Sequence, residues 1–227
     1  MEGINKKDGR NIKYVKIVDY EGGCKVEKPI LFNTEMVKAI LEGRKTCTRR
    51  ITKFKPYAAL DETNGDFEIC EPVTRNFFRG KLDFERWAIA KCKYKAGDVL
   101  YVRETWANTW TPDGEEGFVY RADGEPSEFP YWGNSKQCKD KVWRPSIHMP
   151  KSAARIFLKV KGVRVEKLQG LDYQGALGEG IVGYDGWTSK FKELWDSTLK
   201  KEQLGLYGWN SNPWVWVIEF ERIDSQK

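Results

Sequence analysis

The segment from Thr34 to Arg50 constrains the fold more than any other part of the chain, because it predicts a short helix followed directly by a polar loop. Thr34 is suited to cap the first turn, and Gly43 stands where a left-handed C-terminal cap is needed. The apolar residues between them recur at helical spacing and form one stripe: Met36, Val37, Ile40 and Leu41. We therefore expect an amphipathic helix that ends near Gly43 and sets the direction of the residues after it.

The loop after Gly43 combines four cations with two hydroxyls and one thiol in the sequence R-K-T-C-T-R-R. If this segment is extended, one face presents the alternate residues: Arg44, Thr46, Thr48 and Arg50. Such a strip suits a polyanion or a polar ligand. The alternative is that the basic residues only complement the helix dipole and remain in water.

The composition of the 227-residue chain is that of an ordinary globular protein, with 40% hydrophobic and 32% charged residues. No apolar run is long enough to span a bilayer and the start does not resemble a secretion signal, so we expect a cytoplasmic protein without membrane contact. Five scattered cysteines include no C-x-x-C pair, which predicts reduced thiols rather than zinc ligands or disulfides. The net charge of +6 permits contact with nucleic acid without requiring it.

The loop resembles the signature of the ASCH domain, a family of PUA-like β-barrels. Gly43, Lys45 and Arg50 stand at the positions of the family's Gly, Lys and terminal Arg. Many members carry Glu where this chain has Thr48, but the small ASCH proteins that hydrolyse acetylated cytidine resemble it in having Thr there. The sequence G-D-V-L-Y-V-R-E-T-W at 97–106 resembles the strand after the signature loop, and resembles proteins encoded by many bacteriophages and prophages.

The resemblance implies an α+β fold, a PUA-like mixed β-barrel with a few short helices. We expect one elaborated domain over residues 1–227. Its core segments are 28–50, 97–106 and 143–223, and the resemblance extends into the region 155–181. Two inserted excursions at the rim of the barrel are expected where turn residues accumulate or the apolar pattern weakens: 51–95 and 107–142.

Alternation of apolar residues predicts the strands, and Gly162 marks a bulge in the one that begins near Ile156. The expected strands are 12–20 at the periphery, 28–32, 97–106, 155–168 and 214–223, with a hairpin turn at Asn64-Gly65. In the last strand, Trp216 and Val217 lie on opposite faces, which suggests burial on both sides. Asp172 is suited to cap a short helix through Ile181, and Ser189 begins a second helix.

The resemblance also implies a catalytic group, because acetylcytidine-cleaving ASCH proteins use a Lys, a Thr and a Glu. The corresponding residues are Lys45, Thr48 and Glu179. A threonine hydroxyl becomes a nucleophile when a base takes its proton, and a lysine can act as that base where burial or nearby cations lower its pKa. Arg44 and Arg50 are the expected cations. The alternative is an ion pair between Lys45 and Glu179 that only holds the helix to the loop.

A second group of candidate binding residues follows the 97–106 segment: Arg103, Glu104, Trp106, Tyr120 and Arg121. Glu104 falls on the apolar face of its strand, where an unpaired carboxylate is costly, so it needs a cationic partner such as Arg44 or Arg50. His148 is the chain's one histidine and stands between prolines, so no metal site is expected around it.

Two functions compete on these observations. In the first, an ASCH-type protein recognises RNA or a modified nucleoside beside the 43–50 loop and hydrolyses an acylated base, without metal or other cofactor. In the second, the protein binds RNA without turnover: Lys45, Arg49 and Arg50 contact phosphate, and Trp106 or Trp132 stacks on a base. A third reading is a phage accessory protein that acts through partners.

Overall fold

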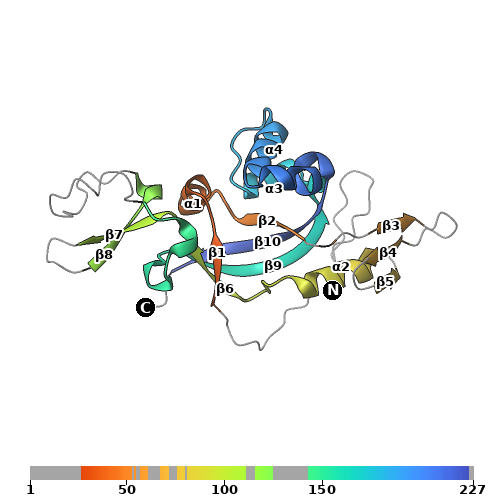
Figure 1. The fold of residues 1–227 in the computed structure, drawn as a ribbon, viewed down its shortest axis with the longest axis horizontal. Helices are drawn as coiled ribbons and strands as arrows, with labels where there is room; N and C mark the ends of the chain where they lie inside the picture. Colours follow the sequence, from red (N-terminus) through yellow and green to blue (C-terminus); the bar gives the residue numbers. More distant parts are fainter. Residues whose placement is uncertain are drawn as a thin grey trace.

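The structure is a computed structural model (Figure 1). It describes residues 27–52, 54, 57–60, 67–71, 76–79, 81–110, 116–124 and 143–224. Three predictions lie outside these residues: the strand at 12–20, the turn at Asn64-Gly65 and the role of Trp132.

A five-stranded mixed sheet is the centre of the fold, in the order β1-β6-β9-β10-β2. Its strands are β1 (Glu27–Leu31), β6 (Val99–Arg103), β9 (Phe157–Lys167), β10 (Trp214–Ile223) and β2 (Cys47–Ile51). β1 and β6 run parallel, and the other three neighbouring pairs are antiparallel. The strands predicted at 28–32, 155–168 and 214–223 are therefore confirmed, whereas the one predicted at 97–106 is shorter: β6 ends at Arg103 and Trp106 begins another strand. β9 bends markedly along its length (Figure 1).

The predicted bulge in β9 is also confirmed. Gly162 pairs with Glu219 and Val160 pairs with Phe220, so Lys161 is an extra residue that has no partner on β10. An inserted residue bends a strand and increases its twist. The bulge therefore lies where the sheet curves.

The helix α1 (Thr34–Leu41) connects β1 to β2, as the apolar stripe predicts. Its N-cap is Asn33 rather than the expected Thr34, because the Asn33 side chain accepts a hydrogen bond from Met36 N at 2.8 Å. Gly43 has φ +72°, which confirms the left-handed turn after the helix.

The two edges of the sheet, β1 and β2, approach each other without strand pairing between them among the described residues. Arg50 on β2 reaches across, and its Nη2 donates to the Leu31 carbonyl on β1 at 2.7 Å. The structure thus shows a mixed α+β fold around a curved sheet. The closed PUA-like barrel stays a prediction.

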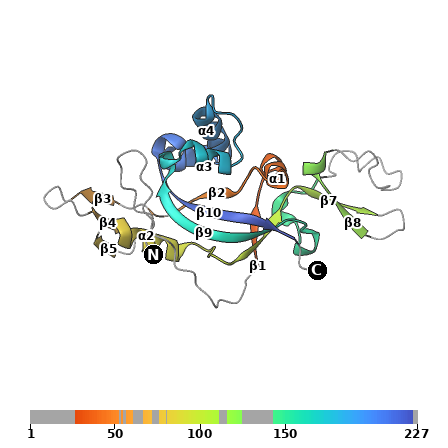
Figure 2. The same cartoon turned by 180° about the vertical axis from the view of Figure 1, so that it is seen from behind.

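The strand β10 is buried on both faces, as predicted. Ile218 and Phe220 pack with α1 and β6 on one face, while Val215 and Val217 pack under the helices on the other. Those helices are α3 (Tyr173–Gly178) and α4 (Trp187–Ser197), and the short helix α5 (Leu204–Tyr207) follows α4. Asp172 caps α3 as expected, and α4 begins two residues before Ser189. In both views α1, α3 and α4 are drawn above the central strands (Figures 1 and 2), although α1 packs against the face of β10 opposite to α3 and α4.

The two predicted excursions form small structures at opposite ends of the molecule (Figure 2). One end holds the antiparallel sheet β3 (Tyr57–Leu60), β4 (Phe67–Glu71) and β5 (Asn76–Arg79), followed by α2 (Lys81–Lys91). The other holds the hairpin β7 (Trp106–Trp110) and β8 (Glu116–Tyr120). The β3-β4 pairing confirms the expected hairpin. The helix α2 was not predicted, and its Phe84 and Ala88 are fully buried.

Short 3-10 turns complete the described part of the chain. They are Arg121–Asp123, Ser146–His148, Lys151–Ala153, Leu168–Gly170, Lys201–Gln203 and Trp209–Ser211. In the described ranges, no helix combines the length and the apolar content that crossing a bilayer requires.

Candidate functional site

The edge strand β2 sorts the residues of the polar loop onto two faces of the sheet. Thr48 and Arg50 are paired with Ile218 and Trp216 of β10, and they share the face of those residues. Cys47 and Arg49 lie on the opposite face, toward α3 and α4. Of the four residues predicted to share one face, only Thr48 and Arg50 do so within β2. Arg44 and Thr46 precede the strand, which begins at Cys47.

Lys45 and Glu179 meet, as the resemblance implies, although 134 residues separate them. They form an isolated β-bridge, and Lys45 Nζ donates to Glu179 Oε2 at 2.5 Å and to the Glu179 carbonyl at 3.0 Å. The side chains are 0% and 4% exposed. Glu179 occupies the C-cap of α3, so the helix end carries the carboxylate to the loop.

Arg49 is the third member of this cluster, and the sequence reasoning missed this role. Its Nη1 donates to Glu179 Oε1 at 3.2 Å, and its Nε and Nη2 donate to Glu166 Oε1 at 3.0 and 2.7 Å. Burial lowers the pKa of the Arg49 guanidinium, but Glu179 and Glu166 more than offset that effect and leave the pKa above its usual value. Because it is buried and doubly paired, Arg49 is not placed to contact a phosphate.

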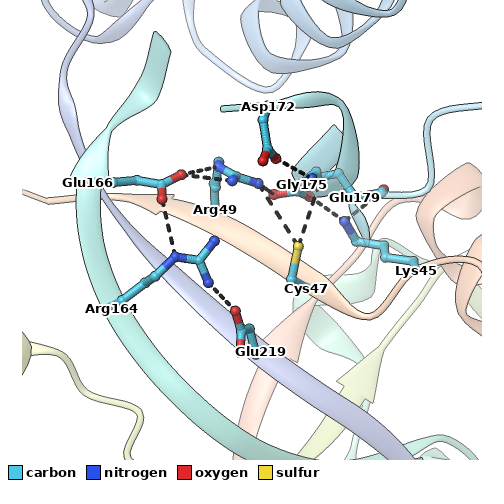
Figure 3. A network of polar contacts seen from close by, with 9 residues as sticks. All are labelled: Lys45, Cys47, Arg49, Arg164, Glu166, Asp172, Gly175, Glu179 and Glu219. Atoms are coloured by element: carbon cyan, nitrogen blue, oxygen red, sulfur yellow. Dashed lines mark hydrogen bonds and ion pairs between the residues drawn. The ribbon is translucent and has the colours of Figure 1, made fainter. Parts of the chain in front are cut away.

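The ion pairs continue outward from this cluster to the surface (Figure 3). Glu166 Oε2 accepts from Arg164 Nε at 3.2 Å, and Arg164 also pairs with Glu219. The chain contains three cations and three carboxylates and has no net formal charge: Lys45, Glu179, Arg49, Glu166, Arg164 and Glu219. It links the loop, β2, β9, β10 and α3.

Glycines allow α3 to approach β2 closely enough for these contacts. A Cβ on Gly175 would lie 2.9 Å from Arg49 Nη2, and one on Gly178 would lie 3.0 Å from Cys47 Sγ. Gly180, with φ +94°, would place a Cβ 2.9 Å from Ala39 Cβ. The glycines that weaken α3 as an isolated helix therefore serve its packing, and their clustering just before and after Glu179 was the sequence signal for this site.

Cys47 lies in the cluster, but its thiol has low reactivity. Burial, reinforced by the negative charge of Glu179, raises the pKa of the Cys47 thiol to about 11. Because the thiolate is the reactive form, Cys47 is not suited to act as a nucleophile.

Thr48 is 2% exposed and lines a cavity of about 30 Å³ together with Glu179 and Arg50. Met36 of α1 and Phe191 of α4 also line it. The volume equals the share of one water molecule in liquid water, roughly 30 Å³. Within the described part of the chain, the Thr48 hydroxyl makes no hydrogen bond to Lys45. Of the implied catalytic residues, Glu179 is thus bonded to Lys45 and lines the cavity with Thr48, whereas Lys45 does not line that cavity.

The other two arginines of the loop lie outside the ion-pair cluster. Arg44 is partly exposed, donates to Glu42, and donates through Nη1 to the Gly180 carbonyl at 2.9 Å. Arg50 lies over the Phe32 ring at 5.2 Å, and burial lowers the pKa of its guanidinium. The cation that shares Glu179 with Lys45 is therefore Arg49 rather than Arg44 or Arg50.

The partner of Glu104 is Arg155, which corrects the expected pairing with Arg44 or Arg50. Arg155 donates to both Glu104 oxygens, at 2.9 and 3.1 Å, and to Asp123 at 2.6 Å. Its guanidinium also lies 3.9 Å from the centre of the Tyr120 ring. Burial raises the pKa of Glu104, while the hydrogen bond from Arg155 acts in the opposite direction.

The remaining members of this second group support local structure. Trp106 is 3% exposed and packs against Met149 and Phe118, so its ring is covered. Arg103 donates to the Ile147 carbonyl at 3.3 Å, and Arg121 is exposed. The structure does not bring this group to the Lys45 cluster. His148 lies in a 3-10 turn, and the described residues contain no group of side chains able to hold a metal ion.

Comparison with known proteins gives one distant likeness. No family model and no curated protein matches the chain. The crystal structure of protein EF3133 from Enterococcus faecalis V583, described with the family model DUF984, is similar to 87% of this chain and 81% of its own, at 12% identity and a TM-score of 0.39.

Proposed function

We propose that the protein is an ASCH-type amidohydrolase of the PUA-like class, which recognises a modified nucleobase beside the 43–50 loop and removes an N-acyl group like that of N4-acetylcytidine. One observation carries the proposal. Lys45 and Glu179 form a buried pair at 2.5 Å, and Thr48 and Glu179 line the same small cavity. These are the three residues that the resemblance to acetylcytidine-cleaving ASCH proteins implies.

Each residue has a defined role in the proposed reaction. After Lys45 passes a proton to Glu179, its amine takes the hydroxyl proton as the Thr48 oxygen attacks the amide carbonyl, and the collapse of the tetrahedral intermediate releases the base amine, which receives that proton. Water then hydrolyses the Thr48 ester and yields the carboxylic acid. Glu179 orients Lys45, and Arg49 holds Glu179. Arg50, the cation on the same face of β2 as Thr48, would stabilise the developing oxyanion.

The reaction requires the Lys45 side chain to move. Lys45 Nζ is bonded to Glu179 in the ligand-free structure, so it must turn toward Thr48 when substrate is bound. Catalytic hydrogen bonds commonly tighten only in the substrate complex.

Acetate release from N4-acetylcytidine tests this proposal. Thr48→Val keeps the side-chain volume and removes the hydroxyl, so we expect acetate release to fall by at least about 100-fold while affinity changes little. Lys45→Met is expected to behave in the same way. Thr46→Val is the matched control, because Thr46 is an exposed hydroxyl two residues away. Full activity of Thr48→Val would end the nucleophile assignment.

The second candidate function is RNA binding without turnover. In the buried cluster, the side chains of Lys45, Arg49, Glu179 and Glu166 are paired with one another. Structural ion-pair networks have the same arrangement, so the cluster is compatible with a protein that has no catalytic group. In that case wild-type protein releases no acetate but binds single-stranded RNA. Arg50→Ala would then lower the slope of log K against log salt by about 0.7.

A further inference from the structure

A larger cavity lies on the other side of Arg50, in the gap between the two edges of the central sheet. Its volume is about 360 Å³. Ile30 and Ile218 form an apolar wall of the cavity. The end of α2 and the residues after it contribute Lys91, Lys93 and Tyr94 to the lining. Small-molecule sites have volumes of roughly 300 to 1,000 Å³, so this cavity suits a ligand of one or two rings.

The charged groups around this cavity are all positive. Arg50, Lys91 and Lys93 line it, its lining includes no carboxylate, and none of the three has a carboxylate partner within the described residues. Lys45 and Arg49 in the neighbouring cluster are, in contrast, fully paired. A guanidinium carries five N–H donors, and the hydrogen bond to the Leu31 carbonyl occupies one of those of Arg50. An anion in the cavity would satisfy the remaining donors and the partly buried charge.

Two aromatic residues line the cavity, Tyr94 and Trp216, and the polar atom of each side chain is bonded to backbone. The Tyr94 hydroxyl donates to the Pro29 carbonyl at 3.0 Å, and Trp216 Nε1 donates to the Ala88 carbonyl at 2.9 Å. Tyr94 is only 5% exposed and Lys93 Nζ lies 4.6 Å from its ring centre, so the half-buried Trp216 offers most of the apolar ring surface to a ligand. Flat apolar surface beside unpaired cations suits a planar ring that carries an anionic group.

We propose that this cavity binds a nucleoside 5′-monophosphate, with the phosphate at Arg50, Lys91 and Lys93 and the rest of the nucleotide against Trp216. The ligand class follows from the residues of the cavity alone. Its link to catalysis rests on the proposed function. Arg50 also borders the Thr48 cavity, and Thr48 is two residues, about 6.6 Å, farther along the same face of β2. The two cavities therefore adjoin at Arg50.

Calorimetric titration with cytidine 5′-monophosphate, cytidine and inorganic phosphate tests the proposal. We expect the monophosphate to bind wild-type protein at least about tenfold more tightly than either of the other two, because the cations and the Trp216 ring act together. Lys91→Met/Lys93→Met should remove most of that preference. Lys159→Met/Lys161→Met removes the same charge from exposed positions on β9 and is the matched control.

The outcomes separate this proposal from the proposed function. Equal affinity for monophosphate and cytidine, or equal effects of the two double variants, overturns the phosphate site even if N4-acetylcytidine is hydrolysed. Selective binding of the monophosphate, lost only in Lys91→Met/Lys93→Met, supports the site even if no acetate is released. Binding of inorganic phosphate as tight as that of the nucleotide overturns the role of the Trp216 ring. Circular dichroism of each variant confirms that it is folded.

Discussion

Glu179→Gln is expected to destabilise the fold more than other single charge changes in the ion-pair chain. The carboxylate serves two cations at once, with Lys45 Nζ at 2.5 Å and Arg49 Nη1 at 3.2 Å. Glutamine has nearly the same shape but only one acceptor oxygen. Its amide nitrogen would face one of the two cations as a second donor, so that cation would remain buried without a partner.

The magnitude follows from burial. Lys45, Arg49 and Glu179 have side chains that are 0%, 1% and 4% exposed, so water cannot replace the lost oxygen. Breaking a buried ion pair by removing one partner costs about 3 to 5 kcal/mol. For a protein of this size each kcal/mol lowers Tm by about 2 to 4 °C, which predicts a fall of roughly 6 to 20 °C.

Urea unfolding at neutral pH, followed by tryptophan fluorescence and circular dichroism, measures the effect as a shift in midpoint at constant m-value. Glu166→Gln is the matched control, because the Glu166 side chain is 22% exposed and Arg49 keeps its bond to Glu179. We expect it to cost about 1 to 2 kcal/mol. A double-mutant cycle with Lys45→Met should show coupling to Glu179→Gln of at least about 1 kcal/mol.

The reasoning would be refuted if Glu179→Gln were no more destabilising than Glu166→Gln. It would also be refuted if the Lys45 and Glu179 changes were additive within about 0.5 kcal/mol, which is the behaviour of independent sites. Either result would mean that packing rather than charge holds α3 to the loop.

Three further predictions concern other positions. Gly180→Ala should destabilise by about 1 to 3 kcal/mol, since it combines a positive φ with a contact at 2.9 Å, whereas Gly170→Ala, which meets nothing within 4 Å, should be close to neutral in the same urea assay. Cys47 should resist iodoacetamide in native protein near pH 8 and react only after unfolding, as peptide mass spectrometry would show; rapid native labelling would contradict its raised pKa. Burial raises the folded-state pKa of Glu104, so its protonation contributes stability that is complete below about pH 4.5 and is lost as pH rises through the folded-state pKa. Wild-type stability minus that of Glu104→Gln, measured by urea unfolding, should therefore decrease as pH rises above about 4.5.

The sequence pattern predicted the elements whose buried residues follow one regular spacing. The apolar stripe located α1, and burial on both faces of β10 followed from its unbroken run of apolar residues. In α2 the apolar residues do not form one stripe: Leu82 is 41% exposed while Phe84 is fully buried. The helix was missed because its packing depends on β5 and β9, which local periodicity does not report.

The site was predicted in part, and the reasons differ between its residues. Spacing cannot join Lys45 to Glu179 across 134 residues, and only the resemblance paired them. The role of Arg49 could have been inferred from strand alternation. Arg49 lies on the face of β2 opposite Thr48, toward the helices, where a buried guanidinium requires carboxylate partners. Glu104 was correctly expected to need a cation, but the choice of Arg155 depends on the path of the chain into β9.

The order of the strands has a consequence for how the molecule is made. Among the described strands, β2 pairs with β10 alone, and β10 lies more than 160 residues later in the chain. On a ribosome, Thr48 and Arg49 are therefore synthesised long before the strand that aligns them. Long-range pairing of this kind forms slowly. The site is thus assembled among the last parts of the fold, and until then β2 is an unpaired edge that a neighbouring chain or a chaperone can occupy.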